Sequence, residues 1–501
     1  MNFIKSKRIK YILVMFITLL VFSCDGSKDP YLVKTETIYP SDDSFKNELA
    51  DIRITVGTEA FWTLSDPTKQ IIETKKYDFN AENNYEMSPL ELEKYQVLEE
   101  GLNIDGEVKA RGLSNIIDIN NLEDIYPIFM IPVNKAITLL SAEIGIEENI
   151  KNLEGHTVVN LPDGRVLIWG GKDDSGYSSK IYLYSPGKLA VETLNSNYSR
   201  AFHTATLYYL DNSDKSNPKQ LRVLISGGEN ENGDLDIAEI FNPETGKTEE
   251  LAPQPASIGI NQSAVLASNN NFIYFFGGKY HDSGSEKYSN QIVSFNSVRN
   301  TFSQTGTMEK EMENTTATYI GGGKIIVAGG NAANDVFNTV YAFDANSAMI
   351  TSVGNLQDKR TLHQAVLYNG KVYFIGGFST KSGDNFTDVV RDINSATALE
   401  VSGSFLCQLA KGRGRASANF INANTIIVSG GDNGDKTSIK ESEIIELRKN
   451  SCMPSLKTVS LNNPRYNSKS VLTSTGLTVI VGGLSNNDNS SSIMEVMSVI
   501  P

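Results

Sequence analysis

The sequence predicts an all-β protein made of repeated units. A short apolar run that ends in Gly-Gly recurs seven times in the last two-thirds of the chain. The first glycines of these pairs lie 57, 50, 52, 47, 54 and 52 residues apart, at Gly170, Gly227, Gly277, Gly329, Gly376, Gly430 and Gly482. A repeat of about 50 residues whose β runs end in Gly-Gly is typical of the blades of a β-propeller. We therefore expect a seven-bladed β-propeller.

The first 23 residues predict a secretory leader. A cationic start is followed by an apolar run over residues 11–22 that only Thr18 interrupts. Twelve residues are too few to cross about 30 Å of hydrocarbon as a helix, so a signal peptide is favoured over a membrane span.

The end of this leader, Leu20-Val21-Phe22-Ser23-Cys24, resembles the lipobox of bacterial lipoproteins. The resemblance implies that Cys24 is lipid-modified and becomes the mature N-terminus, with residues 24–35 as a lipid-anchored tether. Two or more acyl chains suffice for stable attachment to a membrane. It also implies the bacterial cell envelope, with the outer membrane favoured over the inner. An ordinary secretory signal and an uncleaved anchor are the alternatives.

The chain is acidic, with a formal net charge of −14. Removal of the four basic residues of the leader makes the charge of the mature chain still more negative. No basic stripe is left that could neutralise a phosphate backbone, so nucleic acid is not an expected partner.

Residues 36–132 lack Gly-Gly and predict a separate β-sandwich domain. Short runs of alternating apolar and polar residues occur at 51–56, 107–111 and 128–131, with polar turn residues between them. Short alternating strands separated by polar turns are typical of a β-sandwich of about 100 residues.

The fifth repeat shows the expected blade. Residues 360–367 form a first strand, Asn369-Gly370 a tight turn, and residues 372–375 a second strand that runs into Gly-Gly. Asn-Gly between apolar runs favours a hairpin turn in which both central residues have positive φ. A third strand and a weaker fourth strand complete each blade.

The two ends of the repeated region predict how the ring closes. Only eighteen residues follow Gly483, which is enough for a loop and one strand. A strand-like run at 136–142 precedes the first blade and has no partner of its own. Because an unpaired blade edge exposes hydrogen-bonding groups, we expect a propeller over 133–501 that this N-terminal strand closes.

The blades resemble kelch repeats, and the resemblance covers residues 150–501. The matching elements are Gly-Gly in all seven repeats and Arg-x-x-His at Arg200/His203 and Arg360/His363, with Arg465 at the equivalent position. The chain as a whole resembles a bacterial kelch-repeat β-propeller lipoprotein. It departs from the family in lacking the tryptophan that kelch blades usually carry on the outer strand.

Arg200, Arg360 and Arg465 share one blade position and are candidate ligand-binding residues. If the first strand of each blade lines the central channel, these guanidiniums could bind an anion or a carboxylate in bidentate fashion. The alternative is that each arginine pairs with backbone or acidic groups between blades. Arg413 and Arg415 lie close by in the sixth blade.

The histidines and cysteines give weaker signals. His156, His203 and His363 occupy one repeat position, which favours a packing role over metal binding. Cys407 and Cys452 form either a disulfide or two free thiols. We place Cys407 in a connection between blades and Cys452 between the last two strands of one blade, which lie on opposite faces of the ring.

These features predict a membrane-anchored binding or scaffolding protein. The loops that follow each Gly-Gly are rich in Asp, Asn, Ser and Gly and emerge on one face of the ring, where they suit recognition of a protein or a glycan. The alternative, implied by the kelch resemblance, is an extracytoplasmic sugar-modifying enzyme similar to sialic-acid epimerases or galactose oxidase. No catalytic residue, metal or cofactor is assigned.

Overall fold

The computed structural model describes residues 17–21, 31–33, 35–40, 43–58, 71–79, 85–90, 94–118, 126–139, 144–146, 152–211, 219–268, 271–383, 385–402, 404–486 and 494–500. Strands and turns make up nearly all of them, which confirms the all-β class. The helical elements of this part of the chain are two short 3-10 turns, η1 (Ser44–Glu48) and η4 (Pro186–Lys188).

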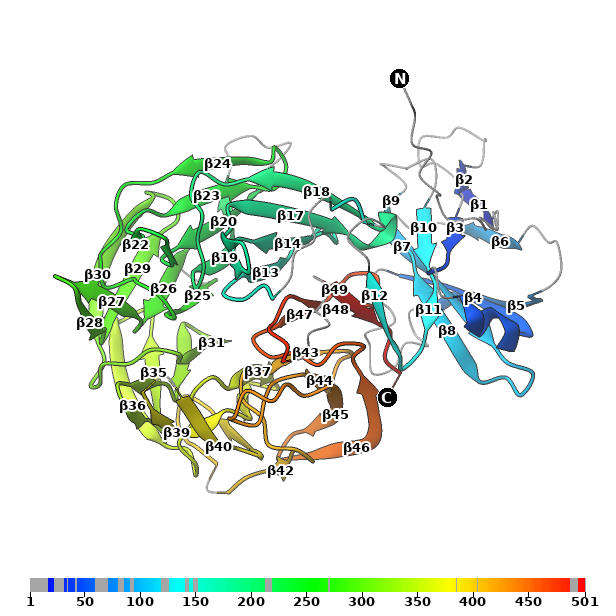
Figure 1. The fold of residues 1–501 in the computed structure, drawn as a ribbon. Helices are drawn as coiled ribbons and strands as arrows, with labels where there is room; N and C mark the ends of the chain where they lie inside the picture. The colour runs from blue at the N-terminus through cyan, green and yellow to red at the C-terminus, as the bar shows by residue number, and fades with distance from the viewer. Residues whose placement is uncertain are drawn as a thin grey trace.

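Seven four-stranded antiparallel sheets of the described residues are arranged as a ring of blades (Figure 1). Blades one to three comprise β13 (Thr157–Asn160), β14 (Val166–Trp169), β17 (Lys180–Ser185) and β18 (Ala190–Asn195); β19 (Thr204–Asp211), β20 (Lys219–Ser226), β23 (Glu239–Asn242) and β24 (Lys247–Glu250); and β25 (Ser263–Ala267), β26 (Phe272–Phe276), β29 (Gln291–Asn296) and β30 (Thr301–Thr307). Blades four to six comprise β31 (Thr316–Gly321), β32 (Lys324–Ala328), β35 (Thr339–Asp344) and β36 (Met349–Asn355); β37 (Gln364–Tyr368), β38 (Lys371–Ile375), β41 (Asp392–Ala396) and β42 (Cys407–Gln408); and β43 (Ser417–Phe420), β44 (Thr425–Ser429), β45 (Glu441–Arg448) and β46 (Ser451–Ser460).

The seventh sheet joins the two ends of the repeated region. Its strands are β47 (Lys469–Leu472), β48 (Thr478–Val481), β49 (Met494–Met497) and, on the outside, β12 (Ala136–Leu139). β12 pairs antiparallel with β49, with Ala136 opposite Met497 and Leu139 opposite Met494. A strand that precedes blade one thus supplies the outer edge of blade seven (Figure 1).

The hydrophobic core lies between adjacent blades. The second strand of blade one, β14, is buried over its whole length because its two faces contact two different neighbours. Leu167 and Trp169 on this strand share a core cluster with Val223 of blade two, and the Trp169 ring packs edge-on against Phe241 at 5.4 Å. A strand buried on both faces is uniformly apolar, which explains the unbroken apolar runs before each Gly-Gly.

The Gly-Gly pairs join each blade to the next. In blade one, Gly170 has a φ of +59°, and a Cβ atom there would lie 2.4 Å from the carbonyl oxygen of Arg200 in blade two. Gly171 donates its N–H to that same oxygen at 2.8 Å. The second glycine makes this bond at all seven junctions, over 2.7 to 2.9 Å, from Gly171 to Arg200, Gly228 to Gly259, Gly278 to Met312, Gly330 to Arg360, Gly377 to Arg413, Gly431 to Arg465 and Gly483 to Leu153.

The unit before the propeller has a main sheet in the order β11-β8-β7-β4-β5, with β9 also paired to β7. A parallel pair, β3 and β10, contributes to the same core, and β1, β2 and β6 form a third sheet. The bounds are β1 (Ile17–Val21), β2 (Tyr31–Val33), β3 (Thr35–Ile38), β4 (Asp51–Thr58), β5 (Ile71–Asp78), β6 (Tyr85–Leu90), β7 (Lys94–Leu102), β8 (Val108–Leu113), β9 (Ile117–Asp118), β10 (Tyr126–Phe129) and β11 (Ile131–Pro132).

This N-terminal unit packs beside blades seven and one (Figure 1). Gln96 of β7 donates a side-chain hydrogen bond of 3.0 Å to the carbonyl oxygen of Ser474, in the turn between β47 and β48. That turn lies at the end of the strands opposite to the Gly-Gly pairs. The contact therefore leaves the Gly-Gly side of the ring facing away from the N-terminal unit.

Most of the predicted leader falls outside the described residues, and so does Cys24. The part that is described, β1, pairs with β2 and β6. Among the described residues there is no helix with the length and hydropathy needed to span a bilayer.

Candidate functional site

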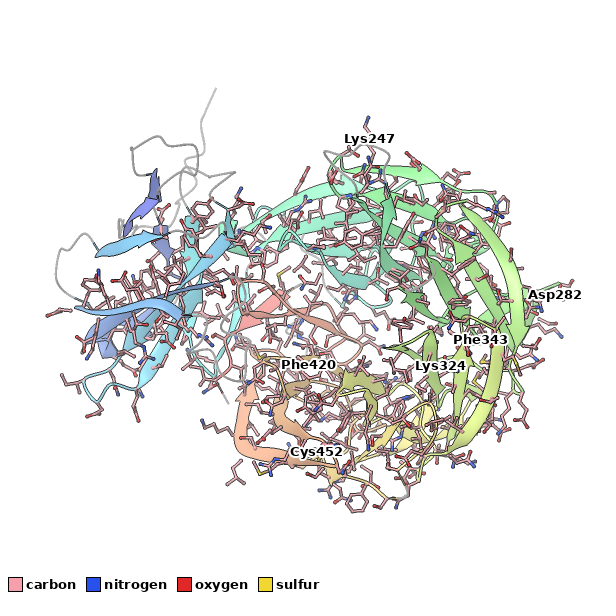
Figure 2. All side chains as sticks on the ribbon, turned by 180° about the vertical axis from the view of Figure 1, so that it is seen from behind. Lys247, Asp282, Lys324, Phe343, Phe420 and Cys452 are labelled. Carbon is pink, nitrogen blue, oxygen red and sulfur yellow. A yellow bond between two sulfur atoms is a disulfide. The ribbon has the colours of Figure 1, made fainter. Side chains whose placement is uncertain are left out.

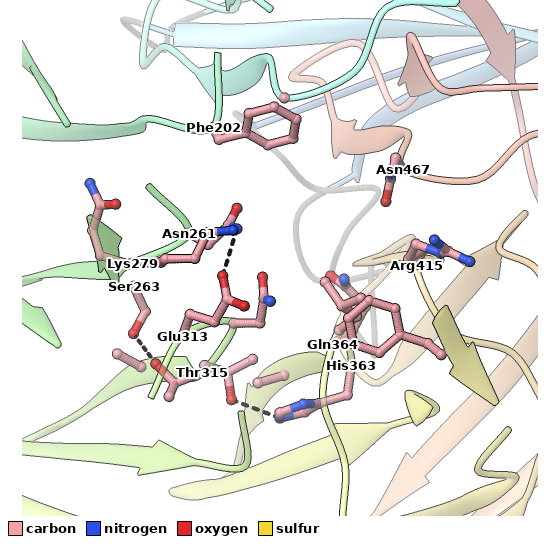
Figure 3. A pocket seen from close by; sticks show the side chains of 18 of the residues that line it. Phe202, Asn261, Ser263, Lys279, Glu313, Thr315, His363, Gln364, Arg415 and Asn467 are labelled. Carbon is pink, nitrogen blue, oxygen red and sulfur yellow. Dashed lines mark hydrogen bonds between the residues drawn. The ribbon is translucent and has the colours of Figure 1, made fainter. Parts of the chain in front are cut away.

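A cavity of about 910 Å³ opens in the middle of the ring and is lined by residues from all seven blades. Its wall is formed where the chain enters the first strand of each blade, next to the Gly-Gly pairs. Figure 3 shows part of this wall, with Phe202, Asn261, His363, Arg415 and Asn467 around the opening.

One residue per blade adopts the left-handed conformation at this wall. We call these residues the inner ring; their φ values lie between +51° and +65°, and they are Gly155, Phe202, Asn261, Asn314, Leu362, Arg415 and Asn467. Backbone hydrogen bonds run from one member to the next, for example from Phe202 N–H to Gly155 O at 2.7 Å and from Asn467 N–H to Arg415 O at 2.9 Å. Such a φ is costly for bulky residues such as Phe202 and Leu362 and persists where the surroundings enforce it. The inner ring thus presents different side chains from equivalent backbone positions.

The residue that follows each member of the inner ring is buried. In three of the seven blades this residue is histidine. His203 Nε2 lies 2.9 Å from Thr157 Oγ1, and His363 Nε2 lies 3.0 Å from Thr316 Oγ1, in each case across a blade junction (Figure 3 shows the second). Desolvation by burial lowers the pKa of His156 and of His363 to about 3, so both rings are neutral at pH 7. The rings of all three histidines also lie against the first glycine of the preceding blade. These are packing positions.

The structure corrects the expectation that the repeated arginines line the channel. Arg200, Arg360 and Arg465 are 0% exposed, and none of them contributes to the cavity wall. The physical reason is that each side chain turns back into its own blade. There it donates to the carbonyl oxygen of the first glycine and to a polar side chain on the third strand.

The partners of these arginines follow one pattern. Arg200 donates to Gly227 O at 2.9 Å and pairs with Glu239 at 2.8 Å. Arg413 and Arg465 make the same two contacts, with Gly430 and Glu443 and with Gly482 and Glu495, and Arg360 contacts Gly376 O and Asn394. The arginines thus pair with backbone and mostly acidic groups, as the alternative interpretation expected, but each does so within a single blade and not between blades.

Charged side chains reach the cavity from the Gly-Gly side instead. Glu313 accepts hydrogen bonds of 2.9 Å from both Asn261 and Asn331, and its carboxylate lies 3.5 Å from Lys381 Nζ (Figure 3 shows Asn261). Lys279 forms an ion pair of 2.9 Å with Glu286. These residues come from blades three to five, and only their place in the fold brings them together.

Arg415, the inner-ring residue of blade six, is held by a different set of contacts. Its guanidinium forms an ion pair with the buried Asp432 and lies 4.9 to 5.2 Å from the ring centres of Tyr466 and Phe378. Desolvation by burial raises the pKa of Asp432, against the opposing effect of Arg415. A fixed guanidinium over aromatic faces gives the cavity mouth a rigid cationic edge.

Cys407 and Cys452 are joined by a disulfide, with 5.4 Å between their Cα atoms. The predicted placement of the two residues on opposite faces of the ring is wrong. Cys407 lies in β42 and Cys452 in β46, and these are the outermost strands of adjacent blades, which contact each other (Figure 2 labels Cys452). No group of three His, Cys, Asp or Glu side chains within the described residues is arranged to hold a metal ion.

Three comparisons with known proteins found similar sequences or structures. A family model described as the Attractin/LZTR1 beta-propeller matches residues 143–390. Kelch-like protein 40 from Xenopus tropicalis is 25% identical over 190 residues, which is 38% of this chain and 29% of that protein. A solved structure titled "Structure of YjhT" aligns with a TM-score of 0.47 and 13% identity, over 62% of this chain and 99% of that one.

The repeats, the ring of blades and the first two matches define a β-propeller. More particularly, the blades are similar to those of kelch-type β-propellers. The chain spans less than a third of the length of Kelch-like protein 40.

Proposed function

We propose that the protein is a membrane-anchored binding or scaffolding lipoprotein whose propeller recognises a partner, a protein or a glycan, through its Gly-Gly side. Many protein-interaction scaffolds contain a kelch-type propeller. The observation that carries the proposal is a belt of hairpins on that side of the ring.

Each of the first five blades inserts a two-stranded hairpin directly after its Gly-Gly. The hairpins are β15 (Lys172–Asp173) with β16 (Gly176–Tyr177), β21 (Glu229–Asn230) with β22 (Gly233–Asp234), β27 (Lys279–Asp282) with β28 (Ser285–Tyr288), β33 (Asn331–Ala332) with β34 (Asp335–Val336), and β39 (Phe378–Ser382) with β40 (Asn385–Val389). We call this set the hairpin belt.

Successive hairpins of the belt are bonded to one another. Tyr177 donates to Glu229 at 2.8 Å between the first two hairpins, and the Gly383 N–H donates to Asn334 at 2.9 Å between the last two. Asp234 similarly accepts from the backbone N–H of His281. A surface fixed in this way loses little conformational entropy when a partner binds, which favours recognition.

The orientation of the two units suits a tethered binding protein. The N-terminal unit contacts the propeller at the turns opposite the hairpin belt. A lipid on Cys24 would hold the chain at a membrane of the cell envelope, the outer membrane in our proposal, with the N-terminal unit as a spacer. The anchor itself rests on the sequence motif. Metabolic labelling with a fatty acid and membrane fractionation test it, and Cys24→Ala is expected to abolish both label and membrane association.

Site-specific photo-crosslinking in the native cells tests the partner surface. A photoreactive residue at Ser175 or Ser283, at the tips of two hairpins, is expected to give discrete adducts with a protein partner. The matched control is Glu244, an exposed turn residue at the opposite end of blade two. Equal adducts from Glu244 would contradict the proposal. If the hairpin positions give no protein adducts, a glycan array with the purified chain decides whether the partner is a glycan. No binding on the array would also contradict the proposal.

A further inference from the structure

We propose that the outer rim of the propeller at blades five and six contacts an anionic membrane surface, with Met453 and Leu456 inserted between the lipid headgroups. This surface is separate from the hairpin belt and from the central cavity. It rests on the membrane anchorage proposed above, because the anchor would bring the rim close to a bilayer.

Exposed apolar side chains gather on the outer strands of these two blades. The disulfide joins Cys407 of β42 to Cys452 of β46 at the edge of the ring (Figure 2 labels Cys452). Phe405 lies two residues before Cys407, and Met453 and Leu456 lie one and four residues after Cys452. The exposed fractions of these three side chains are 42%, 46% and 104%. The crosslink thus holds three exposed apolar side chains on one stretch of the rim.

The edge strand that carries Leu456 is irregular at this point. The register of β46 against β45 shifts between Pro454 and Thr458, and the intervening residues, which include Leu456, bulge from the strand. Pro454 also has no N–H to donate. Prolines and bulges on an edge strand hinder pairing with a further strand. The rim is therefore better suited to insertion of single side chains than to the addition of a β-strand from another protein.

The same strand is basic, although the chain as a whole has a net charge of −14. Residues 448–460 contain three exposed cationic side chains, Arg448, Lys449 and Lys457, and no acidic residue. The acidic residues of the neighbouring strand β45 are paired with cations, Glu441 with Lys411, Glu443 with Arg413 and Glu446 with Arg448. Lys449 and Lys457 thus give this stretch a positive charge, and each lysine near an anionic bilayer raises the affinity about fivefold.

We call Phe405, Met453, Leu456, Lys449 and Lys457 the rim patch. Its composition matches that of surfaces that lie in a bilayer interface, where apolar side chains enter the headgroup region and lysines reach the anionic headgroups. A patch with this charge complements an anionic membrane.

The rim patch also lies in the sector of the ring next to the N-terminal unit. β46 belongs to blade six, and its neighbour blade seven has as its outer strand β12, which follows the N-terminal unit in the chain (Figure 1). Val459 of β46 and Ala136 of β12 share a core cluster. The unit that would carry the anchor and the rim patch are therefore joined through blade seven.

Fluorescence quenching in vesicles tests this contact. The full chain carries a fluorophore on Thr458→Cys, and the vesicles contain phosphatidylglycerol, phosphatidylethanolamine and brominated acyl chains. We expect strong quenching, and less than about half of it in vesicles of phosphatidylcholine. Leu456→Ser, and the double change Lys449→Gln with Lys457→Gln, should each lower the quenching about threefold. The matched control is Val298→Ser, which removes a 68% exposed apolar side chain from blade three and should leave the quenching unchanged.

Flotation of the same vesicles distinguishes failure of the anchor from failure of the rim contact. A chain that does not float lacks the proposed anchor, and its quenching by an excess of anionic vesicles still decides the rim contact. Absence of quenching at Thr458→Cys in anionic vesicles would overturn the rim contact, and so would undiminished quenching in Leu456→Ser. A photoreactive residue at Leu456 that forms an adduct with a protein in the native cells, a second copy of this chain included, would assign the rim patch to that protein and overturn the proposal.

Discussion

The amide N–H of Gly483 donates a 2.7 Å hydrogen bond to the carbonyl oxygen of Leu153 and so joins the last blade to the first. The acceptor lies two residues before the inner-ring residue Gly155. The acceptors at the other six junctions occupy the same repeat position. The closing junction is therefore built like the rest of the ring.

Gly482→Ala is expected to destabilise the propeller strongly. Gly482 has a φ of +61°, and a Cβ atom there would meet the His156 ring and Leu153 O within 2.4 to 2.6 Å. Gly322→Ala is a matched control, because Gly322 has the same φ of +61° but no heavy atom within 4 Å of the added Cβ. Backbone strain alone costs about 1 kcal/mol, and the clash should add at least about 2 kcal/mol. Equal melting temperatures for the two variants would contradict the close approach of the blades.

Arg200→Met should cost more stability than Arg360→Met. Both arginines are fully buried and donate to backbone carbonyls, but Arg200 also neutralises the buried Glu239 where Arg360 contacts the neutral Asn394. A buried carboxylate left without its partner costs about 3–5 kcal/mol. Chemical denaturation measures the difference, and the double change Arg200→Met with Glu239→Gln should recover part of it. Equal losses for the two single variants would show that the ion pair is not decisive.

Reduction of the disulfide should loosen the junction between blades five and six. Cys407 and Cys452 are 45 residues apart in sequence, and a bond that closes such a loop contributes about 2–4 kcal/mol. Cys452→Ser is therefore expected to lower the melting temperature, and a reducing agent should lower that of the unmodified chain to the same value. A melting curve that does not respond to the reducing agent would count against the bond.

The stability of the N-terminal unit should fall as the pH rises from about 5 to 7. Glu99 on β7 is fully buried and accepts a 2.7 Å hydrogen bond from Thr37. Desolvation raises its pKa from 4.5 to about 7, so the folded unit retains a proton that the unfolded chain releases. Below pH 4.5 both states are protonated and there is no penalty. Above pH 7 the full penalty applies, on the order of 3 kcal/mol.

Hydrogen exchange of the β4 and β7 amides, measured across this pH range, tests the titration. Protection should decrease with rising pH in the unmodified chain and become nearly independent of pH in Glu99→Gln, once the intrinsic exchange rate is allowed for. Glu107→Gln, at an exposed position, is the control and should behave like the unmodified chain. Identical profiles for Glu99→Gln and the unmodified chain would contradict the prediction.

The blades could be predicted from the sequence because their junctions require a particular residue. A positive φ combined with a neighbouring carbonyl oxygen leaves room only for glycine, so Gly170 and its counterparts mark every junction. The incomplete last repeat likewise indicates the pairing that β12 makes with β49.

The site could be predicted much less well. The direction of the Arg200 side chain depends on Glu239 in the third strand, and an alignment of the third strands would have shown the equivalent Glu443 and Glu495. The contact of Glu313 with Lys381 joins residues of two blades and has no sequence signal.

Removal of residues 484–501 tests the closed ring most directly. It deletes β49 and leaves β12 without a partner, so blade seven loses its two outer strands while blades one to six keep theirs. A closed ring predicts that the propeller loses its cooperative melting transition as a whole, because each blade depends on both neighbours for its core. A truncated chain whose melting profile matches that of the full chain would contradict the closure.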